Sequence, residues 1–262
     1  MDPRELKLKI VPEHARAIMH FGKWIFVSSL VYFIATNFDR LYLPTVIPIA
    51  LFGVYGIARV LGDAATTLVQ KIGEVIILPS VAQMGDNMAE HLPRIQTMRR
   101  WALLCISMAI GGGMAISDLF VDLVYDPRYA AAIVLLPMLL AGTWFAVQSA
   151  LIEAILIGMS RPQFAASGNI AKLAWGVVMI PLAITHFGLL AAMAVIAFAD
   201  MPRYLLLQAA QRRCGLRFIR DDLGALLLLV ATAVAARFAM VEIGLVDGLI
   251  STAQWQQITA IR

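Results

Sequence analysis

The sequence predicts an all-α protein whose helices cross a membrane about seven times. Three observations support this class, and the first two are that 61% of the 262 residues are hydrophobic and that the mean hydropathy is +0.81. A soluble domain is typically about 45–50% apolar, and a folded chain of this size still exposes much of its surface, so the excess does not fit into one core. The third observation is that no stretch sustains the alternation of apolar and polar residues that marks a half-buried strand. A lipid bilayer accommodates such a chain.

The predicted spans are segments that stay mostly apolar over ~20 residues, the length that a helix needs to cross the hydrocarbon core. They are Phe21–Leu43, Ile49–Met84, Trp101–Val124, Tyr129–Met159, Phe164–Thr185, Leu189–Ala210 and Leu223–Leu245. The second and fourth are too long for a straight span, so we expect them to tilt, bend or project beyond the membrane. The predicted bundle covers residues 21–245, with a polar, linker-like segment at 1–20 and a polar tail at 246–262.

The distribution of Lys and Arg predicts the orientation of these spans. With the N-terminus inside the cell, most of the 21 basic residues fall in cytoplasmic segments. Only Arg40, Arg128 and Arg262 fall in external segments. Cytoplasmic loops of membrane proteins carry such an excess, so the net charge of +4 is explained without a nucleic-acid partner.

Charged residues also occur inside the predicted spans, where a central charge costs about 2.5–3.5 kcal/mol on insertion scales. They are Arg59, Lys71, Lys172, Arg237, Asp63, Glu74, Glu153 and Asp200. We expect these side chains to face protein or water, or to reach an interface along their aliphatic stems.

The clearest polar pattern lies on the second span. Arg59, Asp63, Thr66, Gln70 and Glu74 follow one another at the spacing of a single helical face. Arg59 and Asp63 can pair at i,i+4. Such a stripe forms either the wall of a water-filled cavity or a polar face whose charges are neutralised by a neighbouring helix.

The sequence has none of the nucleotide-binding or metal-binding motifs that we searched for. There is no phosphate-binding G-x-x-x-x-G-K-[ST] loop and no H-E-x-x-H motif. The scattered histidines and the two distant cysteines, Cys105 and Cys214, have no metal-ligand spacing. We therefore expect no cofactor, no metal and no enzymatic activity.

Three stretches resemble a known family. They are FGKWIFVSSLVYFIATNFDRLYL at 21–43, ALFGVYGIARVLGDAATTLVQKIGEVIILPSVAQM at 50–84 and LVYDPRYAAA at 123–132. In order and spacing the chain resembles the polysaccharide-biosynthesis flippases, the O-antigen and exopolysaccharide exporters of the multidrug/oligosaccharidyl-lipid/polysaccharide exporter superfamily.

The resemblance implies a two-bundle transporter of which this chain is the C-terminal half. The segment 1–20 then corresponds to the cytoplasmic linker between the bundles, and we expect a separate N-terminal half or self-association as partner. The implied activity is flipping of undecaprenyl-pyrophosphate-linked oligosaccharide across the bacterial inner membrane, by alternating access. Surface polysaccharide such as lipopolysaccharide O-antigen is the implied product.

Under this reading the intramembrane polar residues divide into two groups. The candidates for the substrate cavity are Arg40, Arg59, Asp63, Gln70, Lys71, Glu74, Lys172 and Arg237. The candidates for coupling to an ion are Asp39, Glu153 and Asp200. Arginine and lysine can hold a pyrophosphate through charge-assisted hydrogen bonds.

Other functions stay open. A multidrug-type exporter or a flippase for the peptidoglycan precursor would use the same fold, although a cationic drug prefers acidic walls. A non-transporting assembly subunit is a further class. A membrane glycosyltransferase or polymerase would need a sizeable loop with carboxylates, and Asp118, Asp122 and Asp126 form the only external cluster.

Overall fold

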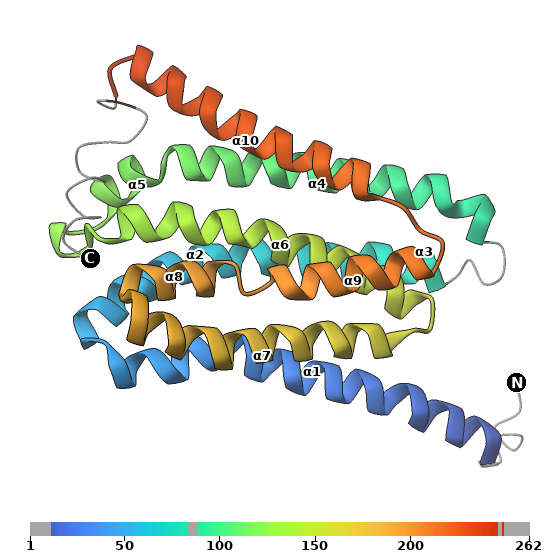
Figure 1. Ribbon diagram of the computed structural model, residues 1–262. Coiled ribbons are helices and arrows are strands. Elements are labelled where there is room, and N and C mark those ends of the chain that lie inside the picture. The colour runs from blue at the N-terminus through green and yellow to red at the C-terminus, as the bar shows by residue number, and fades with distance from the viewer. Residues whose placement is uncertain (1–11, 83–87, 246–247, 249–262) are drawn as a thin grey trace, which may run out of the picture.

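The protein is a bundle of long helices that lie roughly parallel to one another (Figure 1). The computed structural model describes residues 12–82, 88–245 and 248, and within these ranges it contains no strand. The elements are α1 (Pro12–Val46), α2 (Ile49–Ile72), the π-helical turn η2 (Gly73–Ile77), α3 (Leu78–Ala82), α4 (Met88–Ala115), α5 (Ser117–Val124), the 3-10 turn η3 (Pro127–Tyr129), α6 (Ala132–Gly158), α7 (Pro162–Phe187), α8 (Leu189–Ala197), α9 (Met201–Arg213) and α10 (Ile219–Glu242).

The helix α6 forms the centre of the bundle. It is apolar on all sides and buried along most of its length, as expected for a helix surrounded by others. The helices α2, α4, α8 and α9 pack against it, while α1 packs along α7 and α10 along α4 at the two edges (Figure 1). Large apolar side chains such as Phe26, Phe33, Val60 and Leu227 are exposed on the outer faces, where a bilayer would cover them.

The helix lengths confirm the predicted fold class. Within the described residues, six segments are long and apolar enough to cross a membrane: Phe21–Thr45, Ile49–Val81, Ala132–Gly158, Pro162–Phe187, Leu189–Arg213 and Ile219–Glu242. A seventh span exists if Pro93–Ala115 and Ser117–Val124, which meet at an angle of 60°, count as one bent span. This bent pair is the predicted span Trp101–Val124.

Several predicted boundaries move in the structure. Helix α1 begins at Pro12 rather than near Phe21, because Pro is tolerated in the first helical turn and no Pro or Gly follows before Phe21. Part of the predicted linker-like segment is therefore helical, and residues 1–11 lie outside the described residues. The tail at 246–262 is likewise outside them, except for Gly248.

Two of the spans contain irregular helical geometry. The long second span contains the π-helical turn η2, and the fourth is the single helix α6 of 27 residues. The sixth is broken at residues 198–200 between α8 and α9, directly before Pro202 in the first turn of α9. Here α6 approaches very closely, since a Cβ on Gly142 would overlap the backbone carbonyl of Ala197.

Candidate functional site

Two clusters of ion pairs lie between the helices of the bundle, and we refer to them together as the central chain of charges. Their members come from α1, α2, α6, α7, α9 and the break before α9. They are Asp39 and Arg40, Arg59 and Asp63, Glu153, Lys172, Asp200 and Arg203. The four cations and four carboxylates of this set balance, so the central chain of charges carries no formal net charge. Charges that would be costly in hydrocarbon are thereby neutralised against one another.

The outer part of the chain joins α1 to α2. Arg40 forms an ion pair with Asp63, and Nε of Arg59 lies 3.2 Å from Oδ1 of the same carboxylate. The Arg59 Nε is also 3.7 Å from Oδ2 of Asp39, which accepts a hydrogen bond from the hydroxyl of Tyr55. The i,i+4 pair predicted on the second span is therefore present, and a second helix contributes to it.

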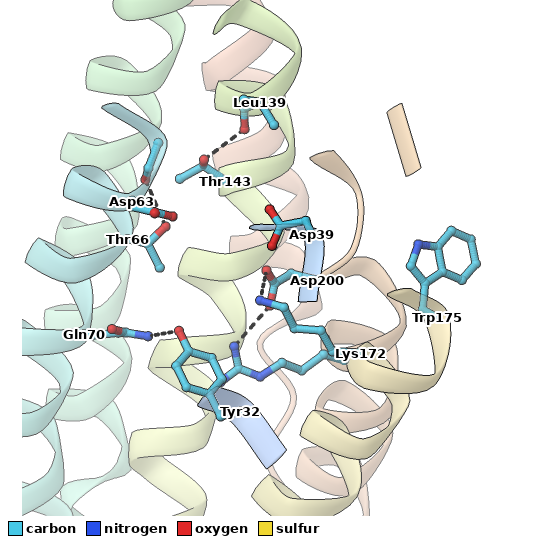
Figure 2. A network of polar contacts seen from close by, with 12 residues as sticks. Tyr32, Asp39, Asp63, Thr66, Gln70, Leu139, Thr143, Lys172, Trp175 and Asp200 are labelled. Carbon is cyan, nitrogen blue, oxygen red and sulfur yellow. Dashed lines mark hydrogen bonds and ion pairs between the residues drawn. The ribbon is translucent and has the colours of Figure 1, made fainter. Parts of the chain in front are cut away.

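The inner part of the chain is built around the break between α8 and α9. Nζ of Lys172 donates to Oδ2 of Asp200 at 2.7 Å, as Figure 2 shows, and Nη1 of Arg203 donates to Oδ1 at 3.1 Å. Arg203 also pairs with Glu153 on α6. A carboxylate at the start of α9 is favoured by the helix dipole, and a discontinuous helix inside a membrane is typical of transport sites.

Tyr32 on α1 connects the two helices that line the site. Its hydroxyl accepts a hydrogen bond from Gln70 on α2 (Figure 2). Nζ of Lys172 lies 5.3 Å from the centre of the Tyr32 ring, and Cζ of Arg203 lies 4.9 Å from it, within the range of cation–π attraction. Tyr32 thus supports both cations that hold Asp200.

Two cavities that include polar and charged side chains in their lining adjoin these charges. The larger has a volume of about 230 Å³, and its polar lining consists of Ser28, Ser29, Tyr32, Gln70, Glu74, Glu153, Asn169 and Arg203. The smaller, about 30 Å³, is lined by Arg59, Asp63, Lys172 and Asp200 among others; that is enough for a water molecule. Residues of α1 and α2 line both cavities, together with residues of α6, α7 and the span formed by α8 and α9. We call this space between α1 and α2 the polar cleft.

Asn169 provides an unused acceptor at the larger cavity. Its Nδ2 donates to the Ser28 hydroxyl at 2.8 Å and to the Ser28 carbonyl at 3.2 Å. Its Oδ1 is buried and has no hydrogen-bond partner in the structure. A water or a ligand hydroxyl would satisfy this oxygen.

Some candidate residues lie apart from the central chain. Lys71 and Glu74 form an exposed pair with 2.8 Å between Nζ and Oε2, and only Glu74 reaches the larger cavity. Arg237 lies at the α4–α5 bend, where it pairs with Asp118 at 2.7 Å and donates to the carbonyl of Ala115 at 3.0 Å. It stabilises the bend, because that carbonyl lies at the end of α4 and lacks a helical partner.

Sequence reasoning missed a second buried ion pair. Nη2 of Arg99 donates to Asp222 on α10 at 2.5 Å and to Gln148 on α6 at 2.6 Å. Arg99 and Arg203 were both assigned to cytoplasmic segments, yet both are buried. For Arg99 the available signal was the absence of Pro or Gly between Pro93 and Trp101, so that α4 begins before the predicted third span. For Arg203 it was the position inside the predicted sixth span.

The long apolar helices and the neutralised charges between them define a polytopic membrane protein with a polar interior. Residues 1–134, slightly more than half of the chain, match the family of polysaccharide biosynthesis proteins. The chain belongs to this family. No curated protein and no solved structure matches the chain.

Proposed function

We propose that this chain forms one bundle of a flippase that moves undecaprenyl-pyrophosphate-linked oligosaccharide across the bacterial inner membrane. Membership of a polysaccharide biosynthesis family supports a substrate of this class. The observation that carries the proposal is the polar cleft between α1 and α2, with two cavities inside otherwise apolar spans.

The side chains of the cleft could bind both the pyrophosphate and the sugars of such a headgroup. Arg40 and Arg59 are guanidinium groups that could bind a pyrophosphate through paired, charge-assisted hydrogen bonds. The free Asn169 Oδ1 and the hydroxyl of Ser28 could bind sugar hydroxyls at the larger cavity. The polyprenyl tail would stay in the bilayer, so that only the polar headgroup needs the cleft.

The balanced charges favour neither a cationic nor an anionic substrate, because each carboxylate and each cation of the central chain already has a partner. Membership of a polysaccharide biosynthesis family is what favours a sugar-containing substrate over a cationic drug. The proposal assigns no catalytic role to the chain.

A second bundle completes the site in this proposal. Arg40, Lys71 and Glu74 are exposed on the side of α1 and α2, where contact with lipid would be costly. A separate N-terminal half, or another copy of this chain, would cover these side chains and rock against them to give alternating access.

The test is reconstitution of the purified chain into liposomes, with and without a co-expressed N-terminal bundle. Flipping of a fluorescent undecaprenyl-pyrophosphate oligosaccharide is expected only with the partner. Arg59→Ala should abolish flipping and Arg59→Lys should retain part of it, because the charge is kept. Asp126→Asn, in an exposed external pair, serves as the control. Efflux of a cationic dye without any flipping would overturn the proposal.

A further inference from the structure

Two guanidinium groups from different helices converge on one carboxylate. Arg40 of α1 and Arg59 of α2 both pair with Asp63. Arg40 contacts Oδ2 and Arg59 lies near Oδ1 of this carboxylate, and two guanidinium groups placed around one anion can bind phosphate as well as carboxylate. The anion that occupies this site in the structure belongs to the protein itself.

Asp63 differs from the other carboxylates of the central chain in its exposure. Its side chain is 33% exposed, against 5% for Asp39, 12% for Asp200 and 19% for Glu153. It also lines the smaller cavity. A carboxylate with this access to water can leave its partners at a lower desolvation cost than a buried one.

Arg59 has donor capacity that Asp63 does not use. Its Nε is buried, and although it lies 3.2 Å from Asp63 it makes no hydrogen bond of good geometry in the structure. Guanidinium donors of Arg99, Arg203 and Arg237 also lack a partner. Arg59, unlike Arg99 and Arg237, lines the smaller cavity, so a ligand oxygen there would satisfy its donor.

We propose that Asp63 is a tethered competitor for an anion site formed by Arg40 and Arg59, and that a pyrophosphate displaces it. The inference rests on the proposed function for the identity of the anion. With Asp63 displaced, the ion pair of Arg59 with Asp39 is the remaining ion pair of the two guanidinium groups, so Arg40 and Arg59 together can neutralise charge on a pyrophosphate.

Competition by Asp63 promotes release of the substrate from the site formed by Arg40 and Arg59. A tethered carboxylate is present at high effective concentration, so it re-enters the site when the pyrophosphate begins to leave. The apparent affinity equals the intrinsic affinity multiplied by the fraction of sites that Asp63 leaves free. The site thus binds the headgroup without retaining it, as a transporter requires.

The experiment measures binding of inorganic pyrophosphate to the purified full chain in detergent by calorimetry. Asp63→Asn should bind at least about fivefold more tightly than the wild type, the lower range of typical coupling between two ligands. Asp63→Glu keeps the competing charge and should bind like the wild type. The double variant Asp63→Asn/Arg59→Gln should lose the gain, and Asp126→Asn, which removes an exposed carboxylate paired with Arg128, should change nothing.

Equal binding by Asp63→Asn and the wild type would overturn the inference, as would a gain that persists without Arg59. If Asp63→Asn unfolds on purification, pyrophosphate in the buffer should restore it, because a ligand that binds only the folded state stabilises that state. A failure of pyrophosphate to restore the variant would also count against the inference. Pyrophosphate binding with the expected pattern but without flipping of lipid-linked sugar would leave this inference standing and refute the proposed function.

Discussion

Lys172 on α7 and Asp200 in the break between α8 and α9 form a buried ion pair, with 2.7 Å between Nζ and Oδ2. The same carboxylate binds Arg203 at 3.1 Å. One carboxylate therefore holds two cations and attaches the broken span to its neighbour. Trp175 supports the other side of the break, since its Nε1 donates to the carbonyl of Val195 at 3.1 Å.

Removing one partner of this pair should destabilise the protein strongly. We expect Lys172→Met and Asp200→Asn each to lower the free energy of unfolding by about 3–5 kcal/mol, because an uncompensated buried charge remains. Asp200→Asn should have the larger effect, since it leaves Lys172 without a carboxylate, whereas in Lys172→Met the Asp200 carboxylate keeps Arg203. Thermal or denaturant unfolding in detergent measures the difference.

The control for this prediction is Arg128→Met, which removes a cation from the exposed pair with Asp126 outside the spans. A pair exposed to water contributes about 0–1 kcal/mol, so this variant should unfold almost like the wild type. Similar unfolding of Arg128→Met and Lys172→Met would show that burial does not determine the strength of these pairs.

The close approach of α6 to the broken span predicts a strict requirement for glycine at position 142. Gly142→Ala should lower the free energy of unfolding by about 1–3 kcal/mol, the usual cost of overpacking, because its Cβ would meet the carbonyl of Ala197. Gly112→Ala on α4 is the matched control, since a Cβ there meets nothing within 4 Å. A neutral Gly142→Ala would contradict the observed packing.

The polar face of α2 should be reachable from water. In a background with both cysteines replaced by serine, Asp63→Cys and Gln70→Cys should react with a small, membrane-impermeant thiol reagent. Val60→Cys and Leu68→Cys should not, because these exposed apolar positions face lipid, where the reactive thiolate does not form. Equal labelling of the two sets would refute a one-sided aqueous face.

The distribution of basic residues predicts the topology. Reporter fusions after Asp126, Arg161, Gly188 and Arg217 should read outside, inside, outside and inside. This follows if the bent α4–α5 pair crosses the membrane as one span. An external signal at Arg217 would show that one of the spans does not cross.

The helical spans could be predicted because the free energy of inserting a segment into the membrane is close to the sum of the contributions of its own residues. The i,i+4 pair of Arg59 and Asp63 was predictable for a similar reason, since the helix itself places the two side chains together. Arg237 shows the limit of this reasoning: as a cation inside a span it was a candidate for the cavity, yet in the structure its partner Asp118 is 119 residues away.

The sequence by itself determined that this chain is a set of membrane-spanning helices with a polar face on the second span, because hydropathy and helical periodicity are local properties. Only the tertiary structure decided which charges meet: that Asp63 receives Arg40 from another helix, that Asp200 lies at a break held by Lys172, and that Arg99 is buried against Asp222. Pairing depends on distances between helices, and these are set by packing, such as the backbone contact at Gly142, which no single segment of the sequence encodes.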